Sequence, residues 1–100
     1  MPRLRIGDLE AAIPIIQGGM GVGISLSGLA TAVANEGGIG VISSAGIGML
    51  DDDYESNFEE ANRRALHREV VKAKAMTKGI IGVNILMALS DCDGLIKTAL

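Results

Sequence analysis

A chain of 100 residues is long enough for one domain with a modest core. The formal net charge of −3, without a basic cluster, argues against binding to nucleic acid or to an anionic membrane. The single cysteine, Cys92, excludes an internal disulfide, and no apolar run has the length of a membrane span or of a signal-peptide core. We therefore expect a cytoplasmic protein that binds neither nucleic acid nor membranes.

The first predicted element is a β-hairpin over residues 4–11. Leu4, Ile6 and Leu9 flank the dipeptide Gly7-Asp8. Glycine in the first place of a two-residue turn is typical of a type II′ hairpin, because that place requires a positive φ. The main fold is expected to begin after this hairpin.

The stretch Ile13–Gly23, with the sequence IPIIQGGMGVG, predicts a strand followed by a glycine-rich loop. Ile15 and Ile16 are β-branched and suit a strand buried on both faces. The four glycines after Gln17 let the backbone approach a flat or phosphorylated ligand closely and adopt positive φ. Ligands of α/β proteins bind at the carboxyl ends of parallel strands, so the loop predicts the position of a site. A tight strand–helix connection without a ligand explains the spacing equally well.

Two further predicted elements follow this loop. Ser25 or Ser27 is expected to cap a helix, which Gly37-Gly38 ends. Ile39–Ser43 is expected to be a second buried strand, and a loop of small residues over 44–48 closes it.

The second half of the chain repeats the helix–strand pattern. The capping-box pattern Ser56–Glu59 predicts the start of a long helix that Gly79 stops. Ile80–Leu86 is predicted to be a third strand. A last helix containing Leu95 and Ile96 is expected to be capped by Asp91 or Asp93.

The predicted order is a hairpin, then β-α-β-α-β and the start of another helix. Such alternation indicates an α/β fold with right-handed crossovers and a parallel sheet. Three strands do not close a barrel, and an eight-stranded barrel takes roughly 250 residues. We therefore expect residues 1–100 to be the opening portion of a larger fold, with both outer strand edges open.

The glycine loop does not match the common nucleotide-binding motifs. Leu26 stands where a G-x-G-x-x-G fingerprint needs its third glycine, and the second strand ends in Ser43-Ser44 rather than in an acidic residue. The sequence also lacks G-K-[ST]. These differences exclude classical NAD binding and P-loop chemistry.

Two amide side chains are candidate ligand contacts. Asn84 interrupts an apolar strand, and a buried amide must find hydrogen-bond partners. Near the carboxyl end of that strand it could face the same mouth as residues 18–20. Neighbouring backbone groups could equally well satisfy it. Gln17, at the end of the first strand, has the same two interpretations.

The titratable residues predict neither a catalytic residue nor a metal site. His67 lies among arginines on the polar side of the long helix and is expected to be a solvated surface histidine. Cys92 is expected in a polar loop beside Asp91 and Asp93, and no role is predicted for its thiol. The Asp51–Asp53 run could bind a cation, but a solvated loop before a helix is favoured. No nucleophile–base pair is visible.

Four segments of the chain resemble a known family. They are PIIQGGMG over residues 14–21, SLSGLATAVANEGG, IGVIS and GVNIL. In this order and spacing they resemble the nitronate monooxygenases, formerly called 2-nitropropane dioxygenases. They are equally similar to the related FMN-dependent enoyl-acyl-carrier-protein reductases. The resemblance covers almost the whole chain and implies the start of an FMN-containing TIM (β/α)8 barrel, several times longer than this chain when complete.

The resemblance also implies a cofactor site. Gly18, Gly19 and Met20 would lie in the first βα loop, whose backbone lies against the flavin ring. Asn84 would be the third-strand asparagine that hydrogen-bonds FMN. Two further residues at strand ends are implied more weakly, Gln17 and Ser43.

The catalytic histidine and the loops that grip the FMN phosphate come from later strands in the family. His67 does not occupy the catalytic position. The implied activity is oxidation of alkyl nitronates with O2. The alternatives are reduction of an enoyl thioester, or a non-catalytic fragment that self-associates as a homo-oligomer through its strand edges.

Overall fold

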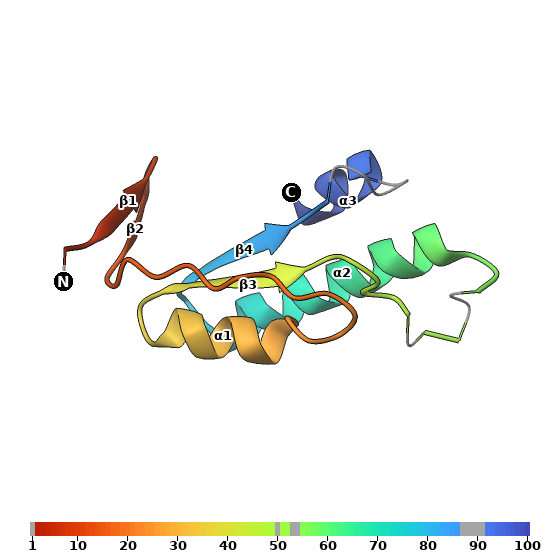
Figure 1. Cartoon of the computed structure of the whole chain (residues 1–100), viewed down its shortest axis with the longest axis horizontal. Helices are drawn as coiled ribbons and strands as arrows, with labels where there is room; N and C mark the ends of the chain where they lie inside the picture. Colours follow the sequence, from red (N-terminus) through yellow and green to blue (C-terminus); the bar gives the residue numbers. More distant parts are fainter. Residues whose placement is uncertain (1, 50, 53–54, 87–91) are drawn as a thin grey trace.

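A computed structural model describes residues 2–49, 51–52, 55–86 and 92–100 of the chain (Figure 1). The elements in chain order are β1 (Leu4–Ile6), β2 (Leu9–Ala11), α1 (Ser27–Asn35), β3 (Ile39–Ser43), α2 (Phe58–Met76), β4 (Ile80–Asn84) and α3 (Cys92–Ala99). They form a two-stranded hairpin and a separate two-stranded parallel sheet, with helices packed on the parallel sheet.

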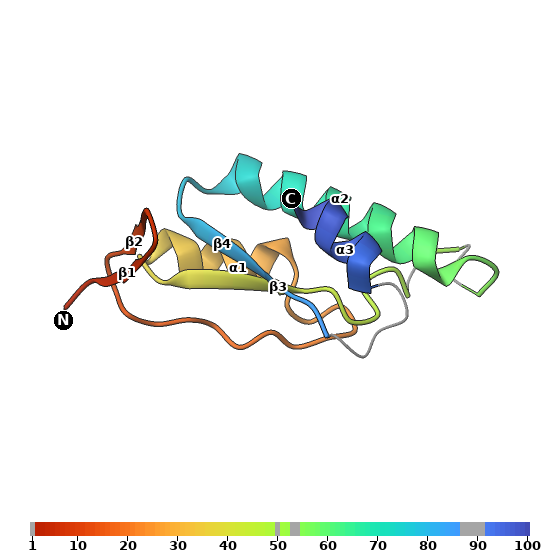
Figure 2. The ribbon, with the colours of Figure 1, turned by 90° about the horizontal axis from the view of Figure 1, so that it is seen from above.

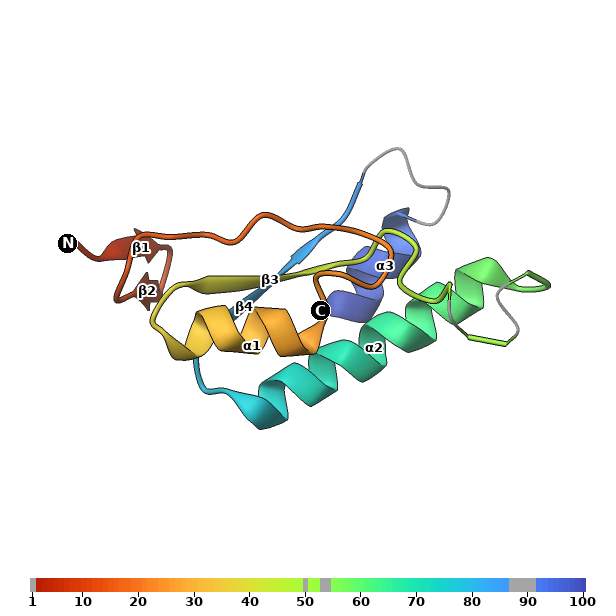
Figure 3. The same cartoon turned by 60° about the horizontal axis from the view of Figure 1, so that its bottom comes forward.

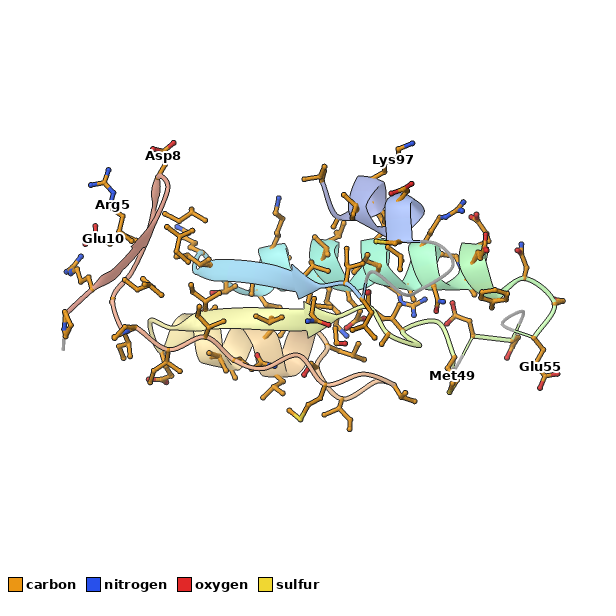
Figure 4. The ribbon with its side chains drawn as sticks, turned by 45° about the horizontal axis from the view of Figure 1, so that its top comes forward. Arg5, Asp8, Glu10, Met49, Glu55 and Lys97 are labelled. Atoms are coloured by element: carbon orange, nitrogen blue, oxygen red, sulfur yellow. The ribbon has the colours of Figure 1, made fainter. Side chains whose placement is uncertain are left out.

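The hairpin lies at the end of the molecule where β3 and β4 begin (Figure 1). β1 and β2 are antiparallel, with Leu4 opposite Ala11. Gly7 has a φ of +57° while Asp8 keeps a negative φ, as a type II′ turn requires. The hairpin prediction is therefore confirmed. Ala11 packs with Ile39 and Val41. Charged side chains of the hairpin, including Arg5, project away from the sheet (Figure 4).

The parallel sheet is built on β3. β4 pairs with β3 in parallel register, from Ile39 opposite Ile80 to Ser43 opposite Asn84. The predicted strand β4 ends at Asn84 rather than at Leu86. All five residues of β3 are buried, because β4 lies on one side of it and the Ile13–Gln17 segment on the other.

The expected first parallel strand is much reduced. It makes a single parallel bridge, between Ile16 and Ile39. Ile15 and Ile16 are 50% and 55% exposed, so the prediction that both are buried is wrong. The physical reason is that β3 covers only one edge of this segment, and within the described ranges no further strand covers the other.

The helices cover one face of the parallel sheet (Figure 3). Ile42 of β3 and Ile81 and Val83 of β4 pack there against small and aliphatic residues of the helices, namely Ala30, Ala65, Leu66, Ala73 and Leu95. Because side chains alternate along a strand, Gly82 and Asn84 belong to the opposite face. α3 packs against α2, as seen from above in Figure 2.

α1 ends as predicted but begins differently. Gly37, with φ +95°, donates its N–H to Ala34 O, and Gly38 N donates to Val33 O, which is a Schellman ending. The N-cap position belongs to Leu26, whose side chain makes no cap hydrogen bond. The predicted cap by Ser25 or Ser27 is therefore wrong.

The long and last helices also have shifted ends. Asn57 rather than Ser56 is the N-cap of α2, so the predicted capping box is wrong. α2 ends at Met76, three residues before Gly79. α3 begins at Cys92, which is therefore helical rather than in a loop, and Asp93 lies in its first turn. The alternative cap, Asp91, lies outside the described residues. In the part of the chain that the structure describes, no helix combines the length and apolarity needed to cross a membrane.

The contact between α1 and β3 depends on Gly40. A Cβ at Gly40 would overlap the carbonyl oxygen and Cα of Ala30, both main-chain atoms. Gly40→Ala should therefore push α1 from the sheet and lower the free energy of unfolding by about 3 kcal/mol or more. Gly28→Ala is the matched control, because Gly28 is exposed in α1 with open space at its Cβ position. It should raise stability by about 0.5–1 kcal/mol. Urea unfolding of both variants measures the difference; equal effects would contradict the close packing.

Candidate functional site

The glycine loop leaves the sheet at Gln17. The side chain of Gln17 continues the hydrogen-bond pattern that the main chain of this segment forms with β3. Gln17 N donates to Ile39 O at 3.0 Å, as in a parallel ladder. One step further along β3, Gln17 Nε2 donates to Val41 O at 3.1 Å and Val41 N donates to Gln17 Oε1 at 3.1 Å. A carboxamide has the same donor and acceptor as a peptide group, so it replaces the next residue of the strand. The main chain is thereby free to turn away above the sheet.

Ser25 closes the loop that Gln17 opens. Its side chain is fully buried, and its Oγ accepts from Met20 N at 2.8 Å and from Gln17 Nε2 at 3.1 Å. Ser25 N also donates to Met20 O at 2.9 Å, and Ser43 N donates to Ser25 O at 2.9 Å. The loop is therefore fixed to itself and to the end of β3.

The fixed loop brings Gly19 against Asn84. A Cβ on Gly19 would lie 2.8 Å from Asn84 Cβ, 3.2 Å from Asn84 Cγ and 3.5 Å from Val41 Cγ1. Glycine is needed here because of the close approach. A positive φ occurs at only one of the loop glycines, Gly23, at +79°, and at the neighbouring Val22, at +55°. The expected meeting of the loop and Asn84 at one end of the sheet is thus observed.

The main-chain carbonyl of Asn84 is hydrogen-bonded within the protein, whereas its side chain is exposed to solvent. Its carbonyl oxygen accepts from Ser44 N at 3.0 Å and Ser44 Oγ at 2.9 Å. Its side chain is exposed, and among the described residues its carboxamide has no hydrogen-bond partner. The interpretation that neighbouring backbone satisfies this amide is therefore wrong. The group can bind a ligand without first breaking a protein contact.

The six residues that the sequence predicts as cofactor contacts differ in their exposure to solvent. Gly18 and Gly19 are exposed and Met20 is 49% exposed, on the outer side of the loop. Gln17 is partly buried with its amide already bonded, and Ser43 is 3% exposed. Asn84 and the loop therefore form the accessible surface, and Gln17 lies behind it.

The arrangement suits binding more than proton transfer. No residue of the group titrates near neutral pH, since its polar side chains are amides and hydroxyls. His67 is exposed on α2, as predicted. Within the described ranges no three metal-binding side chains gather.

Asp51 is engaged in ion pairs rather than available to a cation. Its carboxylate lies 3.1 Å from Arg64 and 3.3 Å from Arg68. Burial alone would raise the pKa of Asp51, but hydrogen bonds and charges from both arginines outweigh it and hold the pKa below its ordinary value. The prediction of a solvated loop is therefore wrong for Asp51. Asp53 lies outside the described residues.

A buried contact that the sequence did not predict holds the start of α1. Glu69 of α2 is 7% exposed, and its Oε1 accepts from Ser27 N at 3.0 Å and from Ser27 Oγ at 2.8 Å. Glu69 therefore caps the N-terminus of α1, whose own N-cap residue makes no side-chain hydrogen bond. A signal was present, because Glu69 is four residues from both Ala65 and Ala73 on the buried face of α2.

Gln17→Glu tests whether the carboxamide holds the loop. The carboxylate would face Val41 O and lose both donated bonds, so the free energy of unfolding should fall by about 1–3 kcal/mol. The reverse isosteric change, Glu10→Gln on the exposed hairpin, should change it by less than about 0.5 kcal/mol. Urea unfolding measures both, and a Gln17→Glu chain as stable as the Glu10→Gln control would contradict the assignment.

Asp51→Asn should lower stability in a pH-dependent way. The paired carboxylate has a lowered pKa, so its contribution is complete above its ordinary pKa of 3.8 and disappears as the pH falls through the folded-state value. The difference between wild type and Asp51→Asn in the free energy of unfolding should therefore vanish in acid. Urea unfolding from neutral pH to below 3.8 measures it, with the exposed Asp52→Asn as control. A difference that persists in acid would contradict the ion pairs.

Comparison with known families agrees with the resemblance to nitronate monooxygenases that the sequence motifs indicate. The model of the family described as nitronate monooxygenase matches residues 4–97, which include the glycine loop, the parallel sheet and nearly all of α3. No curated protein matches the chain. Because the family match covers nearly the whole sequence, the chain belongs to the nitronate monooxygenase family.

Proposed function

We propose that the chain forms the ring-facing wall of an FMN site in an FMN-dependent oxidoreductase of the nitronate monooxygenase type. The observation that supports this best is the free carboxamide of Asn84 beside the close-packed backbone of Gly19. Membership of the family supports an oxidoreductase at the level of the family. In this proposal residues 1–100 are the amino-terminal portion of a TIM-barrel domain.

The described residues fit the ring of FMN better than its phosphate. The Asn84 carboxamide offers two donors and an acceptor to the polar edge of a planar heterocycle. The backbone at Gly18 and Gly19 can approach such a ring, and Met20 offers a polarisable apolar contact. The group formed by Gln17, Met20, Ser43 and Asn84 carries no cation, so phosphate binding is not assigned to it.

The role proposed for these residues is to bind and orient. Bound FMN would supply the redox chemistry, oxidation of an alkyl nitronate with O2 as the final oxidant. Asn84 would hold the ring edge, and Gln17, through Ser25 and Val41, would keep the loop in place. Ser43 would fix Ser25 from the end of β3. No proton transfer is assigned to this group.

A second candidate function is flavin binding without turnover. The absence of a titratable side chain from the accessible group formed by Gly18, Gly19, Met20 and Asn84 favours it. The same wall would also serve enoyl-thioester reduction, because nothing in the juxtaposition of Gly19 and Asn84 selects a substrate. A visible spectrum of the purified chain, followed by assays with an alkyl nitronate and with an enoyl thioester, distinguishes these functions.

Asn84→Ala should weaken FMN binding by about fivefold, because one hydrogen bond of about 1 kcal/mol is lost. Gly19→Val should weaken it more, since its side chain must displace the loop from Asn84. Asn57→Ala is the matched control, because Asn57 is an exposed asparagine whose side chain makes no cap hydrogen bond. Titration of FMN fluorescence with the purified 100-residue chain and its variants gives the dissociation constants.

Two results would count against the proposal. Equal affinities for Asn84→Ala and Asn57→Ala would remove Asn84 from the site. Wild-type affinity in Gly19→Val would show that the loop does not line the ring. Circular dichroism of each variant establishes that a weakened binder is still folded.

A further inference from the structure

A cavity of about 100 Å³ lies beside the glycine loop, at the end of the sheet where the site is. Its wall comes from the end of the glycine loop, the loop after β3 and α2. Figure 3 shows these two loops side by side beside the start of α1. They are joined there, because Val22 N donates to Ala45 O at 2.8 Å. These elements are consecutive in the chain, so residues 22–69 form the cavity by themselves.

The interior of this cavity is apolar. The aliphatic side chains in its wall are Val22, Leu26, Ile47 and Met49. Two charged residues also line it, but both have partners in the protein. Glu69 accepts hydrogen bonds from Ser27 N and Ser27 Oγ, and Arg68 forms an ion pair with Asp51. The cavity therefore offers its contacts to an apolar group.

Val22, at the entrance of the cavity, has a main-chain conformation that its side chain disfavours. Its φ is +55°, in the left-handed region that a β-branched residue rarely adopts. The side chain is 60% exposed, so burial among the described residues does not offset this strain. Strained residues of this kind cluster where proteins hold ligands. The strain at Val22 therefore supports a ligand contact for its isopropyl group.

We propose that this cavity binds the alkyl group of the substrate, with Val22 and Met49 at its entrance. Met49 is 46% exposed on the loop after β3 (Figure 4). The identity of the ligand rests on the proposed function. Val22 follows Gly19 by three residues, so their Cα atoms are at most about 11 Å apart. The cavity is therefore next to the proposed ring-facing wall.

The size of the cavity selects a short alkyl group. An apolar cavity of about 150 Å³ binds benzene, with its six carbon atoms. By the same proportion, about 100 Å³ holds about four carbon atoms. Gly46 keeps this space open, since a Cβ there would lie 3.4 Å from Val22 Cγ2 and 3.7 Å from Met49 Cε. The cavity thus favours a short-chain alkyl nitronate over a long-chain enoyl thioester.

The test measures the binding of nitroalkanes, from nitroethane to 1-nitrohexane, to the 100-residue chain without flavin. NMR of the chain with labelled valine and methionine methyl groups observes Val22 and Met49 directly. Both signals should shift on binding. Each added methylene should strengthen binding about fourfold up to about four carbon atoms, because it is removed from water. Longer probes should gain less than about twofold per methylene, since the cavity is then full.

Val22→Ala should weaken the binding of 1-nitrobutane by about fourfold or more, because apolar contact at the entrance is lost. Val22→Ile keeps a branched apolar side chain and should bind as the wild type does. Val71→Ala is the matched control, since Val71 of α2 is 53% exposed and does not line the cavity. It should leave the affinity unchanged.

Three results would overturn the proposal: no shift at Val22 and Met49, affinity that rises fourfold per methylene through all the probes, or wild-type affinity in Val22→Ala. Methyl signals away from the cavity establish that each variant is folded. Because flavin is absent from the measurement, its outcome is separate from the FMN titration. A chain that binds nitroalkanes here but does not bind FMN would refute the ring-facing wall and support the alkyl site.

Discussion

The candidate site depends on one side chain that acts as backbone. The carboxamide of Gln17 forms both hydrogen bonds with Val41 that the next residue of a strand would have formed. The main chain can therefore turn away from β3 early while the buried peptide groups of Val41 keep their hydrogen-bond partners. Leaving those groups without partners would cost free energy. A third bond, from Gln17 Nε2 to Ser25, ties the far end of the loop to the same point. The position of Gly19 over Asn84 follows from these bonds.

The accessible and structural parts of the site are separate. Residues whose polar groups are bonded within the protein, Gln17 and Ser25, lie behind the loop. The carboxamide of Asn84, at the end of β4, has no hydrogen-bond partner within the part of the chain that the structure describes. The fixed backbone of the loop and this one carboxamide are therefore the parts of the surface that a ligand can reach. The chain belongs to the nitronate monooxygenase family, and no side chain of this group titrates near neutral pH.

The long helix α2 orders the elements around it by charge as well as by packing. Its buried face places Glu69 at the start of α1, where a carboxylate meets unsatisfied N–H groups. Its other side places Arg64 and Arg68 at Asp51, in the loop after β3. Side chains of α2 therefore contact the chain beside both loops at the carboxyl ends of the sheet. Glu69 binds the residue where the glycine loop gives way to α1, and Arg64 and Arg68 bind the loop after β3.

The sequence by itself determined the hairpin and the helix–strand alternation, because these depend on local turn chemistry and on hydrophobic patterning. It offered the meeting of the glycine loop with Asn84 as one of two interpretations, and the structure decided between them. It also carried the family resemblance that the comparison confirmed. Only the tertiary structure decided the features that depend on residues distant in the sequence, namely the burial of one segment and the cap of one helix. Ile15 and Ile16 are β-branched, but their burial requires a neighbouring strand that the described chain lacks. The cap of α1 comes from Glu69, 42 residues away, and no local pattern at Ser25 or Ser27 encodes it.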